Sequence, residues 1–199
     1  MNSLYERMCT VDATPQFAWK RTALALLVAL AVALLLNWAI LNLFGQTSPY
    51  RAEHSLVGIL LLMAVAALHP QRNESPGKVA GFFLLALIPC YLGTVVSDLD
   101  IRLCGIGCHR NPLLHSGLSF FILLWLVRGQ HDFLQTLVLG FGVGLASHLL
   151  WDVVDYGDVR WLPGGLLDRI WLGSNGFLCL VLAGGKLHYR VGIQQISRN

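Results

Sequence analysis

The longest apolar stretch of the chain, residues 22–44, constrains the fold most, because its 23 consecutive residues carry no formal charge. A helix of about 20 apolar residues crosses the hydrocarbon core of a bilayer. A secretory signal has a shorter apolar core of about 7–15 residues followed by a small-residue cleavage site, so we expect this stretch to remain as an anchor. Of the 199 residues, 13% are charged, against about 25% in a soluble domain. The sequence therefore predicts an integral membrane protein.

Further apolar stretches predict an all-α fold, a polytopic bundle of about six transmembrane helices. Two stretches, residues 79–96 and 133–154, are long enough to span unaided. Three shorter ones, residues 55–69, 113–127 and 171–187, need polar flanks to complete a span. Five or four spans, with a re-entrant segment, are the alternatives.

The placement of Lys and Arg predicts that both termini face the cytoplasm, in the cell membrane or an inner membrane. With six spans and the N-terminus inside, nine of the 14 basic residues fall on the cytoplasmic side. We expect residues 1–19 to form a polar arm and residues 20–199 a single membrane domain, with a motif-bearing region at 97–165. The net charge of +3 includes no basic patch, so nucleic acid is not an expected partner. Membrane lipid is expected, and no protein partner follows from the sequence.

The polar residues of chemical interest fall in three separated segments, 97–100, 108–116 and 147–152. These segments close the third predicted span, open the fourth and close the fifth. In an alternating topology all three lie at one membrane face. Ionisable residues near a membrane interior are costly and usually mark function. We therefore expect the three segments to form one site.

Local spacing suggests how such a site is built. His148 and Asp152 are four residues apart on a predicted helix and share a face. They can bind one metal together, or Asp152 can orient His148. Asn111 and Pro112 predict a helix N-cap followed by the first helical position. His115 would then lie in the first turn, where free backbone N–H groups favour an anionic ligand.

The combination of imidazole and carboxylate groups predicts a divalent metal. Together these ligands suit zinc, manganese or iron, whereas carboxylates alone suit magnesium. The candidate metal ligands are Asp98, Asp100, His109, His115, His148 and Asp152. Asp98, His148 and Asp152 are also the candidate catalytic residues. Arg110 and Ser116 are the candidate substrate-binding residues.

Simpler interpretations exist for the same residues. Asp98 and Asp100 can be a solvated helix end, and His148 with Asp152 a structural hydrogen-bonded pair. The remaining histidines stand at span ends without acidic partners of this kind and are expected to be interfacial; they are His54, His69, His131 and His188.

Glycine and cysteine positions add two expectations about packing. Gly140, Gly142 and Gly144 follow no predicted strand, so they do not form a dinucleotide fingerprint; instead they predict close approach of a neighbouring helix. Cys104 and Cys108 lie in a predicted outer loop. They are expected to form a disulfide in an oxidising compartment and not to bind the metal.

The order of the polar residues resembles that of the membrane-bound metal-dependent hydrolases, a family that includes proteins described as LexA-binding inner-membrane proteins. The resemblance covers about residues 90–165. The matching residues are Asp98, Asp100, His109, Arg110, His115, Ser116, Ser147, His148, Asp152, Gly157 and Leu162-Pro163. Leu114 and Asp155 stand where members often have threonine. The resemblance implies a metal-dependent hydrolase and names no substrate.

A second resemblance is to the type 2 phosphatidic acid phosphatases, which share the His-x-x-x-Asp spacing of His148 and Asp152. Their Lys…Arg-Pro phosphate clamp and the arginine before the histidine have no counterpart here. The leading hypothesis is thus a membrane hydrolase with one or two divalent metals, acting on an amphiphilic or anionic substrate such as a phosphoester. The alternatives are a non-catalytic membrane subunit with a structural polar or ion site, and a lipid phosphatase of the type 2 kind.

Overall fold

The computed structural model describes residues 15–43, 45, 48–68, 76–155, 161–162 and 165–196, with backbone alone at residues 15–19, 49 and 186–196. The helices are α2 (Pro15–Leu43), α3 (Pro49–Leu68), α4 (Pro76–Val96), α5 (Leu99–Cys104), the 3-10 turn η1 (Ile106–Cys108), α6 (Leu118–Leu126), α7 (Asp132–Val154) and α8 (Leu166–Ile196). Residues 1–14 of the expected polar arm lie outside this range, and residues 15–19 belong to α2.

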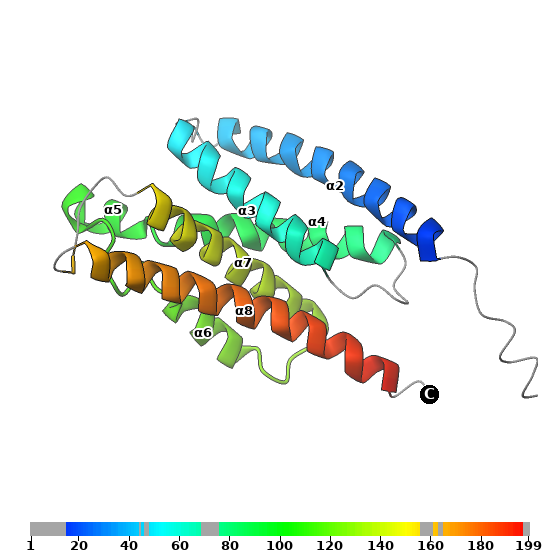
Figure 1. The fold of residues 1–199 in the computed structure, drawn as a ribbon. Helices are drawn as coiled ribbons and strands as arrows, with labels where there is room; N and C mark the ends of the chain where they lie inside the picture. The colour runs from blue at the N-terminus through cyan, green and yellow to red at the C-terminus, as the bar shows by residue number, and fades with distance from the viewer. Residues whose placement is uncertain are drawn as a thin grey trace, which may run out of the picture.

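Within the described residues, five helices are long and apolar enough to cross a membrane, and they pack as a bundle (Figure 1). The candidate spans are Lys20–Leu43, Tyr50–Ala67, Pro76–Val96, Asp132–Val154 and Leu166–Gly185. Helices α2, α3 and α4 each begin at a proline. Proline suits a first helical position because it lacks the N–H that would have no intrahelical partner there. The predicted helical membrane bundle is confirmed.

Helices α4 and α7 run parallel and in close contact through small residues. A side chain at Gly140 would meet the backbone of Ala86, and one at Gly144 would overlap the carbonyl of Cys90. One helical turn further along, His148 contacts the Thr94 carbonyl at the same separation of 54 residues. The glycines therefore allow the close approach that their pattern predicts.

The predicted span at residues 113–127 is wrong as a continuous helix, because only the nine residues of α6 are helical there. Since α4 and α7 are parallel, the chain still has to return along the bundle between them, and α6 makes part of that return. The expected helix start at Pro112 is also wrong. The Asn111 side chain accepts the Leu113 N–H at 3.0 Å, and the chain makes turns until Leu118.

One end of the bundle gathers the end of α4, the start of α3, all of α5, the end of α7 and the start of α8 (Figure 1). The described start of α2 and the end of α8 lie at the opposite end. This arrangement brings the three polar segments together, as the alternating topology predicts.

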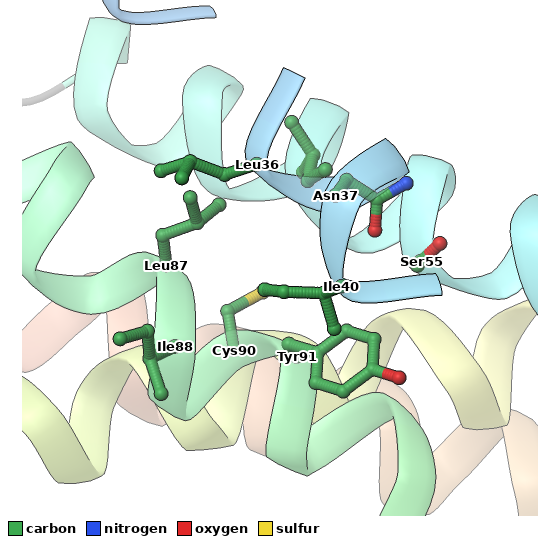
Figure 2. Close-up of a pocket in the computed structure, with 9 residues that line it drawn as sticks. Leu36, Asn37, Ile40, Ser55, Leu87, Ile88, Cys90 and Tyr91 are labelled. Carbon is green, nitrogen blue, oxygen red and sulfur yellow. The ribbon is translucent and has the colours of Figure 1, made fainter. Parts of the chain in front are cut away.

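A separate pocket of about 80 Å³ lies between α2, α3 and α4 (Figure 2). Leucine and isoleucine side chains form most of its lining, with Asn37, Ser55 and Tyr91. Its lining includes none of the six candidate metal ligands. The polar cluster is thus a distinct feature of the fold.

Candidate metal centre

Helix α7 supplies two fully buried residues of the cluster, His148 and Asp152. Their positions one helical turn apart bring His148 Nε2 to 3.4 Å from Asp152 Oδ2. The predicted shared face is confirmed, and both groups point into the interior of the bundle.

Asp98 and His115 bring two further donor atoms to the same place. Asp98 lies in the turn between α4 and α5, and its Oδ1 is 3.6 Å from His148 Nε2. His115 lies in the turns before α6, and its Nε2 is 3.4 Å from His148 Nε2 and 3.5 Å from Asp152 Oδ2. Four atoms from three separated segments therefore converge, and we call these four residues the donor set.

Each residue of the donor set is also held through its second polar atom. His148 Nδ1 is 2.9 Å from the Thr94 carbonyl, and His115 Nδ1 is 3.0 Å from Asp100 Oδ2. A ring nitrogen that donates to such an oxygen leaves the other nitrogen with a lone pair toward the centre, and this arrangement typically orients metal-binding histidines. The Nε2 atoms of both imidazoles are thus presented as ligands.

The second oxygens of the two carboxylates contact residues of α3. Asp152 Oδ1 is 3.1 Å from His54 Nε2, and Asp98 Oδ2 accepts a hydrogen bond from Arg51. His54 is fully buried, so its expected interfacial position is wrong. Arg51 is not among the candidate residues that the sequence singles out. The available signal was the topology, which put the start of α3 at the same face as the cluster.

Asp100 and His115 both have their pKa lowered below the ordinary value. Burial acts to raise the pKa of Asp100, but the hydrogen bond and charge of His115, with the Asn111 N–H and His109, together lower it below its ordinary value. Burial lowers the pKa of His115, and the Asp100 hydrogen bond opposes this only in part. A neutral imidazole is the form that binds a metal.

Asp100 and His109, which are also candidate ligands, lie next to the donor set. Asp100 orients His115, and its Oδ1 is 3.6 Å from His109 Nδ1. His109 Nδ1 is 3.9 Å from Asp98 Oδ1. Asp100, His109 and His115 form a second group of donors close enough to hold an ion, next to the first.

The two candidate substrate-binding residues differ in position. Arg110 is buried, with its Nε 4.0 Å from Asp152 Oδ2, and it donates a 2.7 Å hydrogen bond to the Asp155 carbonyl. Ser116 Oγ donates to the Leu113 carbonyl at 2.7 Å and accepts the Leu118 N–H at 3.3 Å. Arg110 is thus within reach of the donor set, whereas Ser116 stabilises the turn before α6.

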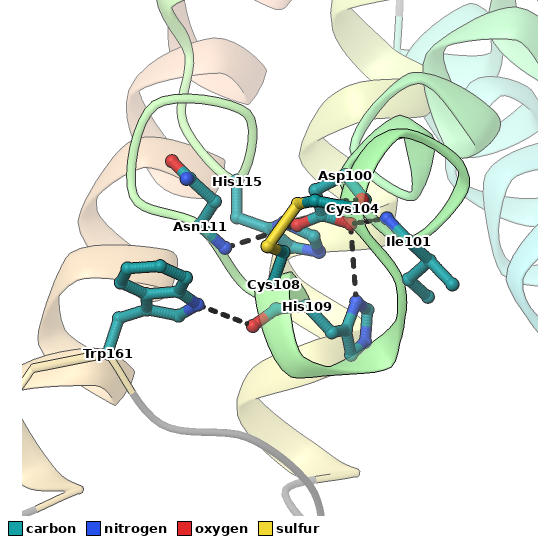
Figure 3. Close-up of a disulfide and its surroundings, with 8 residues drawn as sticks. All are labelled: Asp100, Ile101, Cys104, Cys108, His109, Asn111, His115 and Trp161. Carbon is teal, nitrogen blue, oxygen red and sulfur yellow. Dashed lines mark hydrogen bonds and ion pairs between the residues drawn. A yellow bond between two sulfur atoms is a disulfide. The ribbon is translucent and has the colours of Figure 1, made fainter.

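A disulfide between Cys104 and Cys108 closes the loop that carries part of the cluster (Figure 3). The Cα atoms are 5.8 Å apart, and the predicted bridge is confirmed. The next residue, His109, is held through its carbonyl, which accepts a 2.8 Å hydrogen bond from the Trp161 indole. The bridge and the indole fix the loop between α5 and the turns that carry His115.

A family model described as Domain of unknown function (DUF5942) matches residues 80–190. The chain belongs to this family. The DUF5942 match includes the whole donor set, and Arg51 and His54 lie before it. No curated protein and no solved structure matches the chain. Gly157 and Pro163, which contribute to the resemblance to the hydrolases, lie outside the described residues.

The spacing of the donor set in this DUF5942 protein fits a four-coordinate metal. Zinc binds nitrogen and oxygen ligands at about 2.0–2.2 Å in a tetrahedron, which puts neighbouring ligand atoms about 3.3–3.6 Å apart. Four of the separations among these atoms, at 3.4–3.6 Å, agree with this range. Among the described residues, Asp98 Oδ1 and Asp152 Oδ2 accept no hydrogen bond. Two buried carboxylate oxygens directed at neighbouring imidazole nitrogens at these distances could hold a divalent cation.

Proposed function

We propose that the protein is a membrane-embedded, metal-dependent hydrolase of an anionic ester. The observation that carries the proposal is the donor set, in which each buried residue turns one polar atom to a common centre and has the other fixed. Two nitrogen and two oxygen donors favour zinc over magnesium, which prefers octahedral oxygen ligands.

Within this proposal, His115, His148 and Asp152 hold the metal and Asp98 acts as the base. A catalytic zinc site keeps one position open, whereas a structural site is closed by four protein ligands. Asp98 Oδ1 is the most distant of the three neighbours of His148 Nε2, at 3.6 Å. We therefore assign it to accept a proton from the attacking water. A bound divalent cation would supply Lewis acidity and lower the pKa of that water.

Arg110 would bind the anionic group of the substrate. Its guanidinium lies beside Asp152, and arginine binds phosphate or carboxylate oxygens through two parallel hydrogen bonds. For a phosphomonoester, the water oxygen bonds to phosphorus and the ester P–O bond breaks. The proton removed from water ends on the leaving alcohol.

The histidine-nucleophile mechanism of the type 2 lipid phosphatases has less support from the geometry. A nucleophilic histidine is oriented by a carboxylate on the ring nitrogen opposite the attacking one. Here Asp152 lies beside Nε2 of His148, and the opposite nitrogen contacts the Thr94 carbonyl. This arrangement suits two ligands of one metal better than a nucleophile and its orienting partner.

Metal analysis of His148→Ala tests the proposal. We expect purified wild-type protein to hold about one zinc ion per chain and the variant to lose both zinc and hydrolytic activity, because a removed ligand also releases the remaining ones. His131→Ala is the matched control, since His131 is exposed at the start of α7. Equal zinc in wild type and His148→Ala would contradict the proposed centre. Zinc without hydrolysis of any ester would favour the non-catalytic subunit.

A further inference from the structure

The short helix α5 has its burial pattern inverted relative to a helix at an aqueous surface. Leu103 is 77% exposed and Leu99 is 37% exposed, whereas Asp100 between them is 1% exposed. In water a surface helix turns its leucines inward and its carboxylates outward. The inversion indicates that the surroundings of α5 are apolar.

The exposed apolar surface continues past α5. Ile106 in η1 is 62% exposed, and Leu113 in the turn after His109 is 69% exposed. We call Leu99, Leu103, Ile106 and Leu113 the apolar cap. Leu99 and Leu113 are within two residues of Asp100 and His115, so the cap lies next to the metal centre. Large exposed apolar patches mark surfaces that contact a membrane or a partner.

The length of α4 places the cap at the edge of the bilayer. Its 21 residues give a length of about 31 Å at 1.5 Å per residue, close to the roughly 30 Å of a bilayer's hydrocarbon core. Helix α5 begins three residues after α4 ends. On α4 itself, Ile88 and Leu92 are exposed as well.

Charged and aromatic residues around the cap match a phospholipid interface. Arg102 is exposed on α5 between the buried Asp100 and the exposed Leu103. Arginine near a membrane edge extends its charge to the phosphate layer while its methylenes remain among lipid. Trp161 and Trp171 donate their indole N–H groups to backbone carbonyls of the same loop, and tryptophan is enriched at membrane interfaces.

We infer that the apolar cap is inserted in the headgroup boundary of the bilayer and that the substrate is a phosphoester lipid, which reaches the metal centre from the membrane. The substrate part rests on the proposed function, whereas the insertion part does not. The lipid phosphate enters beside Arg110, and its acyl chains stay in the bilayer along the cap. Burial of the donor set beneath an apolar surface suits a substrate that is itself half apolar.

Electron paramagnetic resonance tests the insertion directly. A nitroxide is attached at Leu113→Cys in a background where Cys9, Cys90 and Cys179 are serine and the disulfide is kept. In vesicles of phosphatidylcholine and phosphatidylglycerol, we expect it to be relaxed more by oxygen than by a water-soluble nickel chelate. Gln130→Cys, exposed beyond α6, is the control and should show the reverse. Equal access of the chelate to both sites would overturn the insertion.

Two substrates test the lipid part. The pair Leu103→Glu and Leu113→Glu should keep the zinc content of the wild type and lose at least about tenfold in phosphate release from phosphatidic acid in phosphatidylcholine vesicles. Hydrolysis of soluble p-nitrophenyl phosphate should be unchanged. An equal fall on both substrates would overturn the lipid assignment. If wild-type protein with bound zinc hydrolyses neither, the proposed function fails together with that assignment, and the nitroxide result still decides the insertion.

Discussion

The charged residues of the cluster carry more negative than positive charge. Three buried carboxylates, Asp98, Asp100 and Asp152, face two guanidinium groups, those of Arg51 and Arg110. Burying a charge without compensation costs several kcal/mol. The net charge of these three carboxylates and two guanidinium groups is −1, and a divalent cation among the donors would change it to +1. A bound cation would therefore offset the excess of carboxylates in this buried site.

The variant Asp98→Asn tests whether Asp98 acts as the catalytic base or as a metal ligand. We expect the variant to keep about one zinc per chain and to lose hydrolysis by about 100-fold or more, because general-base catalysis contributes about 10²–10⁴-fold. Zinc content and initial rates are measured on the same preparation. Loss of zinc in parallel with activity would make Asp98 a ligand of a closed site and would favour a structural role for the metal.

His54 and Arg51 are positioning residues that act through the two carboxylates. His54→Ala and Arg51→Ala should each weaken zinc affinity by about 10–100-fold, the usual effect of removing a partner that orients a ligand. Competition with a chromogenic chelator measures the affinity. Arg51→Lys should restore part of it, which a general loss of folding would not allow. His131→Ala and Arg128→Ala are matched controls at exposed positions, and a similar loss in them would refute the assignment.

At the scale of helices, the contact between α4 and α7 sets the geometry of the donor set. Helix α4 ends at the turn that carries Asp98, and α7 carries His148 and Asp152. Their backbones can approach because Gly93 faces the backbone of Phe141 and Leu145, and because Gly144 faces that of Cys90. Small residues are what permit such approach in membranes, where packing replaces the hydrophobic effect as the force between helices.

Gly144→Ala should disturb this contact and the metal centre together. The added methyl overlaps the Cys90 carbonyl, so the helices have to separate, at a cost of about 1–3 kcal/mol for overpacking. We expect a lower melting temperature in detergent and weaker zinc binding. Gly81→Ala is the control, because nothing lies within 4 Å of a side chain there and alanine favours the helix by about 0.5–1 kcal/mol. Equal melting temperatures for the two variants would contradict this account.

In the whole molecule, the donor set lies at one end of the bundle. The described ends of the chain lie at the other end (Figure 1). The excess of Lys and Arg predicts that this other end faces the cytoplasm. The disulfide then lies on the outer side, where oxidising conditions preserve it.

Reporter fusions in bacterial cells test this orientation. Alkaline phosphatase fused after Gly107 should be active, because it folds only outside the cytoplasm, and green fluorescent protein fused after Gln130 should fluoresce inside it. Both residues are exposed, on either side of α6. The opposite pair of results would invert the topology while leaving the geometry of the cluster unchanged.

The sequence by itself determined the features that depend on local length and spacing. An apolar stretch long enough to cross a bilayer forms a helix because its backbone groups have no other partners there. The spacing of His148 and Asp152 placed them on one face, and alternation of spans brought three polar segments to one end of the bundle. The disulfide follows from two cysteines separated by three residues.

Only the tertiary structure decided which atoms meet. His54 precedes Asp152 by 98 residues, and nothing near it in the chain indicates the contact. Whether Asp100 is a ligand or orients His115 depends on the path of the loop, which leaves the expected helix at Pro112 and makes turns until α6. Both features depend on contacts between residues far apart in the chain, and these contacts determine where each side chain lies. Local propensity and spacing carry no information at that scale.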